Sequence, residues 1–261
     1  MTKSIYPVIF AAILVSSLSG CLHLNDSNDT LFQSSTIGAL FERVYDGDTT
    51  YKELKEHGDF GIGTFDGVDG EMVALDGNFY QIKADGKAYP VDDEMRTPFA
   101  VVKFFESDKT IPLEGSLDMR RTTAYIDGQL PTENIFYAVR IDGIFSSMKV
   151  RSVFRQQKPY PPFSEVVRNQ SVFELHDVIG TIVGFRFPEY INGINVPGYH
   201  FHFISEDRKA GGHVLEFELR KGKAELDSTN KFYMVLPHRE EFYRANLNRS
   251  KPSDVEKEKA E

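Results

Sequence analysis

The chain of 261 residues is long enough for one large domain or two small ones, and its 41% apolar and 26% charged residues exclude a disordered or collagen-like protein. Its 39 acidic and 30 basic side chains give a formal net charge of −9, which argues against nucleic acid as a partner because phosphate binding requires a basic surface. The single cysteine, Cys21, excludes an intrachain disulfide.

Residues 1–20 have the features of a secretory signal peptide. Lys3 supplies a positive charge, and the apolar run that follows over residues 5–18 is too short to span a bilayer, for which about 20 residues are needed. The run ends in Leu-Ser-Gly before Cys21, which resembles the lipobox of bacterial lipoproteins and implies that this cysteine carries the lipid. An ordinary secretory signal with an unmodified cysteine is the alternative.

Residues 21–35 are rich in Asn, Asp and Ser and are predicted to form a flexible tether behind this lipid anchor. Several acyl chains on one residue would hold the protein firmly at a membrane, whereas one chain binds only marginally. Leu22 stands after the cysteine, where an Asp is the usual signal for retention at the inner membrane. The sequence therefore favours the cell envelope, at the periplasmic face of the outer membrane.

The first half of the mature chain is predicted to combine two short helices with an antiparallel meander. Apolar residues at helical spacing indicate helices over residues 36–44 and 51–57. From Phe60 onward, short apolar and polar runs alternate with Asp-Gly pairs, which is typical of hairpins because Gly adopts the positive φ that these turns need. We predict strands over residues 61–65, 71–75, 79–83, 88–91 and 99–105.

The second half is also predicted to be rich in strands. A strand over residues 136–141 is expected to end in a turn at Asp142-Gly143, and an alternating strand follows over residues 149–154. Pro159, Pro161 and Pro162 then suggest an inter-domain connection, followed by one or two helical turns over residues 164–170. We predict further strands over residues 177–187, 199–205, 212–220 and 231–236, and a charged helical tail from residue 237.

Three of the seven histidines are predicted to converge. His200 and His202 alternate with phenylalanines in a strand, so both imidazoles point to one face. Residues 206–212 are turn material, and a hairpin there would bring His213 beside the first two. Three neutral imidazoles suit a divalent metal such as Zn²⁺ with an open position for water or substrate. The alternative is two ordinary strand histidines and an unrelated third.

Glu71 and Arg151 are the two other polar residues that the pattern singles out. Glu71 opens a strand after two Asp-Gly pairs, and Arg151 alternates with apolar residues. From the pattern alone, either is best interpreted as a charge that faces solvent. Beside a metal, however, an arginine suits a substrate carboxylate and a glutamate suits a proton donor. The glycines at residues 61 and 63 are not a dinucleotide loop, because no helical pattern follows them.

Long ordered motifs resemble the bacterial α-acetolactate decarboxylase family over residues 36–247. The motifs are GDFGIGTF at residues 58–65, DGE at 69–71, FYAVRIDG at 136–143, KPY at 158–160, GTIVGF at 180–185 and GINVPGYHFHFISEDRKAGGHV at 193–214. The resemblance implies a two-domain, strand-rich α/β (α+β) fold. An N-terminal mixed sheet with helices, residues 36–160, would adjoin a smaller C-terminal β-barrel-like domain, residues 161–247, and a tail, residues 248–261.

The resemblance also implies an activity, which is the metal-dependent decarboxylation of (S)-2-acetolactate to (R)-acetoin and CO₂ in acetoin and butanediol biosynthesis. Such an enzyme uses a divalent metal, expected here to be Zn²⁺, and neither thiamine diphosphate nor pyridoxal phosphate. Its partner is a small 2-hydroxy-3-oxo acid, and the family suggests a homodimer.

The family's site residues map onto this sequence by the same motifs. Its metal-binding histidines correspond to His200, His202 and His213, its arginine to Arg151, its first glutamate to Glu71 and its threonine to Thr64. A second family glutamate comes from the tail, which offers three positions, Glu256, Glu258 and Glu261. Glu261 fits best.

The mechanism that follows needs a sink for the electron pair left by CO₂. A metal that polarises the neighbouring ketone would be that sink, Arg151 would orient the substrate, and Glu71 or the tail glutamate would protonate the product on one face. Two other readings stay open. One is a periplasmic lipoprotein that binds a metal or ligand without catalysis, and the other is a metal-dependent hydrolase.

Overall fold

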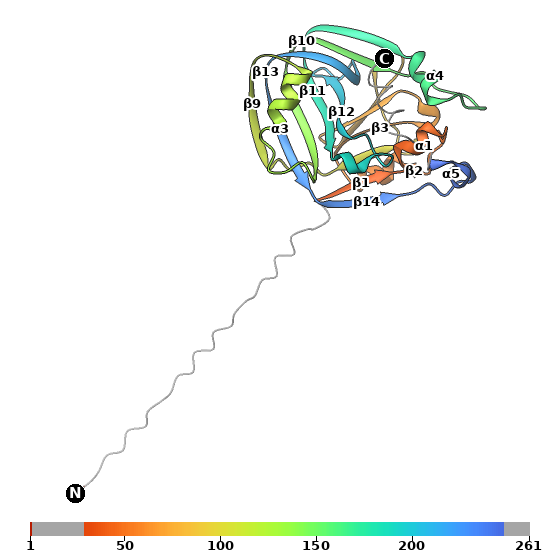
Figure 1. Cartoon of the computed structure of the whole chain (residues 1–261), viewed down its shortest axis with the longest axis horizontal. Helices are drawn as coiled ribbons and strands as arrows, with labels where there is room; N and C mark the ends of the chain where they lie inside the picture. Colours follow the sequence, from red (N-terminus) through yellow and green to blue (C-terminus); the bar gives the residue numbers. More distant parts are fainter. Residues whose placement is uncertain (2–28, 248–261) are drawn as a thin grey trace.

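The computed structural model of the chain describes residue 1 and residues 29–247, which form two packed β-sheets with a few short helices (Figure 1). The predicted signal peptide, Cys21, the first part of the predicted tether and the tail, with its three glutamates, lie outside the described residues. The strand-rich α+β fold class is confirmed. Among the described residues, no helix is long and apolar enough to cross a membrane.

The first sheet, called here the open sheet, has seven strands in the order β14-β1-β8-β3-β4-β5-β6. It is mixed, because β1 runs parallel to β14 and antiparallel to β8. The strands are β1 (Thr30–Ser34), β3 (Phe60–Thr64), β4 (Glu71–Leu75), β5 (Asn78–Ile82), β6 (Ala88–Pro90), β8 (Ala100–Lys103) and β14 (Lys231–Val235).

The second sheet, called here the closed sheet, has the order β10-β11-β12-β13-β9, and β10 also pairs with β13. That extra pairing closes the ring from β10 to β13. The family resemblance implied a barrel-like part within residues 161–247, whereas this ring also includes β10, which precedes them. The strands are β9 (Lys109–Asp118), β10 (Phe136–Ser152), β11 (Ser171–Phe187), β12 (Gly198–Ser205) and β13 (Gly211–Thr229). A two-stranded ribbon of β2 (Thr49–Thr50) and β7 (Arg96–Thr97) completes the strands.

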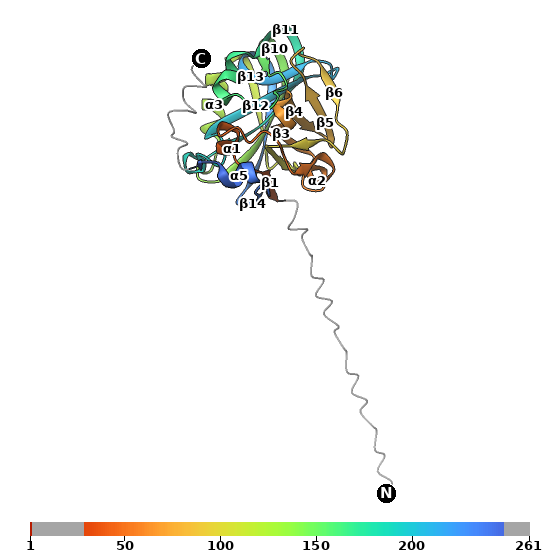
Figure 2. The same ribbon diagram turned by 90° about the vertical axis from the view of Figure 1, so that its right-hand side faces the viewer.

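Short helices lie beside the two sheets (Figure 1 and Figure 2). Figure 1 shows α3 beside the closed sheet, and Figure 2 shows α1 and α2 on the side of the open sheet. Both α1 and α2 begin at a threonine, Thr36 or Thr50, whose hydroxyl accepts a hydrogen bond from a backbone N–H of the first turn. The helices are α1 (Ile37–Phe41), α2 (Tyr51–Lys55), α3 (Met119–Asp127), α4 (Phe163–Arg168) and α5 (Glu240–Arg244), with 3₁₀ turns at Asp66–Val68 and Glu189–Ile191.

The meander of the open sheet follows the predicted hairpins. At the turn between β4 and β5, Asp76 and Gly77 have φ values of 52° and 75°. Positive φ at both central residues is the type I′ turn that Asp-Gly favours and that matches the twist of the flanking strands. The hairpin between β12 and β13, predicted from the turn residues after Ser205, is also confirmed.

Three boundaries differ from the sequence prediction. Residues 30–34, assigned to the tether, form the buried strand β1 inside the open sheet, so that part of the tether prediction is wrong. The turn predicted at Asp142-Gly143 is also wrong, because β10 continues through it. Gly143 lies opposite Gly180 and Gly222, and a Cβ there would come within 2.5 Å of Leu219 Cδ1, so this glycine permits close packing rather than a turn.

The third difference concerns the division near residue 160. Strands β9 and β10 precede that position but belong to the closed sheet, whereas β14 follows it and belongs to the open sheet. The boundary between residues 36–160 and 161–247 is therefore not the boundary between the two sheets. Strand β9 and helix α3 were not predicted, although Asp118 is a good N-cap whose carboxylate accepts a hydrogen bond from the backbone N–H of Arg121.

The two sheets pack face to face through an apolar layer. It contains Ile62, Val73 and Val101 from the open sheet and Val183, Phe185 and Ile204 from the closed sheet. A second apolar cluster fills the interior of the closed sheet and includes Phe145, Phe201 and Phe203. The outer face of β12 consequently lies against the open sheet, which is where the polar residues of the candidate site meet.

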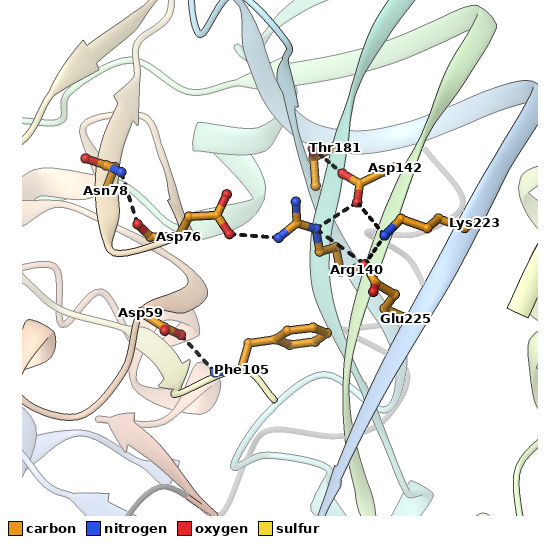
Figure 3. A network of polar contacts seen from close by, with 9 residues as sticks. All are labelled: Asp59, Asp76, Asn78, Phe105, Arg140, Asp142, Thr181, Lys223 and Glu225. Carbon is orange, nitrogen blue, oxygen red and sulfur yellow. Dashed lines mark hydrogen bonds and ion pairs between the residues drawn. The ribbon is translucent and has the colours of Figure 1, made fainter. Parts of the chain in front are cut away.

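Polar contacts also join the two sheets at their surface (Figure 3). The Arg140 guanidinium of β10 donates to Asp142 on its own strand at 2.8 Å and to Asp76 in the β4–β5 turn at 2.7 Å. Asp142 in turn accepts a hydrogen bond from Thr181 of β11 at 2.7 Å. Arg140 therefore ties a turn of the open sheet to two strands of the closed sheet.

Candidate metal centre and active site

Three histidine side chains converge on the outer face of the closed sheet. His202 of β12 pairs directly with His213 of β13, and His200 lies two residues before His202 on the same face. One ring nitrogen from each of the three lies within 4.8 Å of the other two. His200 Nε2 and His213 Nδ1 are 3.2 Å apart. The convergence predicted from the sequence is confirmed, while a bound metal stays a prediction.

The alternation of β12 explains why the histidines face outward. Phe201 and Phe203 point the other way, into the core of the closed sheet, and are almost completely buried. Glycine permits the return strand to approach, because a Cβ on Gly211 would come within 2.2 Å of the Phe203 carbonyl oxygen. The two phenylalanines therefore fix β12 in the core of the closed sheet, and the two histidines between and before them face the site.

His202 is fixed in one tautomer by the open sheet. Its Nδ1–H donates to the carbonyl oxygen of Met72 in β4 at 2.7 Å, so Nε2 carries the lone pair. Nε2 is buried and has no hydrogen-bond partner among the described residues. Burial, with a smaller contribution from the positive charge of Arg151, lowers the pKa of His202 to about 3. A neutral imidazole oriented by a backbone carbonyl is the arrangement that metal-ligating histidines use.

Glu71 and Arg151 form an ion pair beside the histidines. Glu71 opens β4, and its Oε1 lies 3.0 Å from Arg151 Nη1, while its Oε2 lies 3.6 Å from His202 Nε2. The exposed fraction of the side chain is 8% for Glu71 and 13% for Arg151, so neither is the solvent-facing charge that the pattern alone favoured. Burial raises the pKa of Glu71, and Arg151 opposes that rise.

Thr64 lies opposite Glu71 in the pairing of β3 with β4. Its hydroxyl donates to the carbonyl oxygen of Gly70 at 2.7 Å. Gly70 has a φ of 85°, and a Cβ there would come within 2.2 Å of the Ile82 carbonyl oxygen, so only glycine fits. Thr64 therefore holds the turn that leads directly into Glu71.

These residues share one cavity of about 540 Å³ between the two sheets. Its polar wall contains the three histidines, Thr64, Glu71 and Arg151. Its apolar wall comes from helices α1 and α4 and includes Leu40, Phe163 and Val167. The cavity thus combines a few convergent polar groups with an apolar lining, which is typical of a site for a small molecule.

The residues fit a divalent cation. Three imidazoles are a common ligand set for Zn²⁺, and the unpartnered Nε2 of His202 is a buried lone pair that a cation would satisfy. The structure thus brings together every predicted site residue that lies within its described part. The sequence did not predict two further groups of the site. One is the Met72 carbonyl, a backbone group that no residue pattern indicates, and the other is Lys149, which also lines the cavity.

Comparisons with known proteins agree with this architecture. Residues 31–249 match the family described as alpha-acetolactate decarboxylase. A relative from Methanosarcina mazei with that name is 56% identical over 233 residues, which are 89% of this chain and 81% of the relative. A second relative of that name, from Methylococcus capsulatus, is 49% identical over 232 residues and 89% of each chain.

The fold also matches a solved structure of the same description. The crystal structure of alpha-acetolactate decarboxylase from Bacillus subtilis superposes with a TM-score of 0.84 at 41% sequence identity, covering 87% of this chain and 96% of that one. A family match over most of the chain, together with relatives of this identity, shows the family. The chain belongs to the alpha-acetolactate decarboxylase family.

Proposed function

We propose that the protein decarboxylates 2-acetolactate to acetoin and CO₂ and that this reaction depends on a divalent metal. The observation that carries the proposal is the cavity in which three convergent imidazoles lie beside a buried Glu71–Arg151 pair. The family supplies the reaction, and for each step of that reaction a side chain of this cavity can carry it out.

The chemical problem is the electron pair that remains when the C–CO₂ bond breaks. The ketone next to that carbon can accept the pair as an enolate if its oxygen is stabilised. A divalent ion held by His200, His202 and His213, expected to be Zn²⁺, would supply this stabilisation as a Lewis acid when bound. The chain's own residues orient the substrate, exclude water and move the proton.

Arg151 orients the substrate carboxylate. Its guanidinium presents several donors in a fixed plane, of which one N–H is engaged by Glu71. A very tight pair with the carboxylate would stabilise the substrate more than the transition state, in which the charge leaves that group. The existing bond to Glu71 limits that attraction, so Arg151 serves orientation as much as affinity.

Glu71 donates the proton that completes acetoin. It rests as a carboxylate paired with Arg151, but burial raises its pKa, so it takes up a proton from water more readily than an exposed glutamate and can pass that proton to the product. The carboxyl group approaches from the open sheet, whereas the histidines come from the closed sheet. Delivery from that side alone would give one configuration of acetoin, expected to be (R). Thr64 contributes by holding Gly70 and thereby Glu71.

A second acidic group is proposed from the tail. Glu261, or else Glu256 or Glu258, would complete the site, as the family resemblance implies. Separate Gln substitutions at the three positions, compared for kcat, identify the residue, since only one of them should lower turnover by about 100-fold or more. Equal activity of all three variants would contradict a role for the tail.

The decisive experiment measures acetolactate consumption and acetoin formation by the purified protein before and after removal of metal. Exhaustive chelation should abolish turnover, and stoichiometric Zn²⁺ should restore it. Full activity without metal would refute the metal dependence, while metal binding without any turnover would favour a non-catalytic binding protein. Ester or amide hydrolysis in place of decarboxylation would favour the hydrolase reading.

We also propose that the protein is lipid-anchored at the outer membrane and acts as a homodimer. The lipobox-like string before Cys21 supports the anchor, and the family resemblance supports the dimer. Mass spectrometry of the mature N-terminus in wild type and Cys21→Ser, with membrane fractionation, tests the anchor. Sedimentation analysis of the protein expressed without residues 1–21 tests the dimer. A monomer at micromolar concentration would refute it.

A further inference from the structure

A second cationic side chain, Lys149, lines the substrate cavity and takes no part in the proposed decarboxylation steps. Among the described residues that line the cavity, Lys149 and Arg151 are the only lysine and arginine. The two lie on the same face of β10 because residues two apart on a strand point the same way. Their Cα atoms are therefore separated by about 7 Å, which is the rise of two strand residues.

The two cations differ in how firmly they are engaged. Arg151 is held by the buried carboxylate of Glu71 at 3.0 Å. Lys149 lies opposite Glu216 of β13 and makes a longer ion pair of 3.6 Å with it, in which Glu216 is 74% exposed. An exposed pair of this kind contributes little to stability because water and salt screen it. The lysine can therefore exchange this partner for another carboxylate at small cost.

The position of Lys149 suits capture of a ligand at the mouth of the cavity. Its side chain is 37% exposed, compared with 13% for Arg151. Lys149, Met119 and Glu216 also line a second cavity of about 470 Å³ that adjoins the first. The lysine thus lies where the two cavities meet, partly exposed to solvent and with an exchangeable partner.

We propose that Lys149 is a substrate-capturing residue that draws the 2-hydroxy-3-oxo carboxylate into the site, with Glu216 as the competing anion that sets its strength. This inference rests on the proposed function, since it assumes a monoanionic substrate. Loss of neutral CO₂ leaves the negative charge on the enolate, which takes up a proton, so the product acetoin is neutral. Lys149 therefore attracts the substrate and does not retain the product.

This role makes a specific kinetic prediction. A contact that is equally strong in the bound substrate and the transition state lowers KM and leaves kcat unchanged. Lys149→Gln should raise KM for acetolactate by about five- to tenfold, as expected for one partly screened charge at the mouth. Glu216→Gln should act in the opposite direction and lower KM by about two- to threefold, because the lysine is released.

Two stable inhibitors separate charge from shape. One is 2-hydroxy-2-methylpropanoate, which keeps the hydroxyl and carboxylate, and the other is 3-hydroxy-3-methylbutan-2-one, in which a methyl group replaces the carboxylate of acetolactate. Lys149→Gln should raise the inhibition constant of the acid about as much as it raises KM, and leave that of the neutral ketol within about twofold. Raising the salt concentration should narrow the gap between variant and wild type.

The control is Lys221→Gln, an exposed lysine of β13 that lines neither cavity. It should leave all constants unchanged. An unaltered KM in Lys149→Gln, equal losses for both inhibitors, or a fall in kcat at constant KM would overturn the proposal. A wild-type protein that does not consume acetolactate would refute the proposed function, whereas an active wild type with an indifferent Lys149→Gln would refute this inference alone.

Discussion

Removing Arg151 tests whether the buried ion pair is what holds Glu71 in its working position. In Arg151→Met the aliphatic stem is retained but the carboxylate loses its cation, at a site where the Glu71 side chain is only 8% exposed. Two opposite charges 3.0 Å apart interact by about 5 kcal/mol at an effective dielectric constant of 20. Breaking one partner of a buried pair costs about 3–5 kcal/mol in measured cases.

We expect Arg151→Met to lower the free energy of unfolding by about 3 kcal/mol, the low end of that range. Glu71 can relieve part of the cost by taking up a proton, because burial already raises its pKa. The double variant Arg151→Met/Glu71→Gln removes both charges and should recover most of the lost stability. Turnover should fall by about 100-fold or more in the single variant and stay low in the double variant.

The assay is urea denaturation of the wild type, both single variants and the double variant, without metal and again with saturating metal. The exposed pair Lys55–Asp93 is the control, since its side chains are 36% and 53% exposed and Lys55→Met should cost less than about 1 kcal/mol. Two results would show that the ion pair does not hold Glu71 in place. One is an Arg151→Met variant as stable as the wild type, and the other is a double variant no more stable than Arg151→Met.

Three further outcomes follow from the structure. His202→Ala should lose bound metal and turnover together, measured by elemental analysis beside the acetoin assay, and an active metal-free variant would contradict the site. Gly70→Ala should lower kcat by about tenfold or more and destabilise the fold by at least about 1 kcal/mol, because the φ of Gly70 is 85° and the added Cβ would lie 2.2 Å from the Ile82 carbonyl oxygen. An unchanged kcat would show that this turn does not position Glu71. Burial raises the pKa of Asp227, which lies beside Lys103, from 3.8 to about 6. The folded protein therefore binds the Asp227 proton more tightly than the unfolded chain does, and the stability that this proton contributes falls as the pH rises from about 4 to 6. Asp227→Asn should remove up to about 3 kcal/mol of that pH dependence in denaturation curves, and parallel curves for both proteins would show that Asp227 does not titrate there.

The convergence of the three histidines could be predicted from the sequence because its geometry is local. A strand repeats every two residues, so His200 and His202 share a face without any knowledge of the rest of the fold. The turn residues before His213 then bring the third imidazole back across a hairpin of adjacent strands. Glu71 and Arg151 are 80 positions apart and come from different sheets, so only the family resemblance could associate them.

The errors arise where pairing is distant or where composition misleads. Strand β1 has only two apolar residues, Leu31 and Phe32, and pairs in parallel with β14, about 200 residues later, so its local pattern is too short to distinguish it from a tether. At Asp142-Gly143 the local signal is a turn, but Gly143 faces glycines on both neighbouring strands and lets the strands approach. The same dipeptide at Asp76-Gly77 is a real turn, and tertiary packing alone separates the two cases.

The site depends on the packing of one sheet against the other. The open sheet supplies Glu71 and the Met72 carbonyl, and the closed sheet supplies the histidines and Arg151. Two features of the site are costly, the buried carboxyl group of Glu71 with its raised pKa and the buried Nε2 of His202 without a hydrogen-bond partner among the described residues. Both groups are buried where the two sheets pack together. The apolar layer between the sheets and the Arg140–Asp76 contact offset that cost (Figure 3). Substitutions that loosen the sheet interface should therefore reduce activity before they unfold the protein, since the acid and the imidazole would relax toward their ordinary pKa values as water enters.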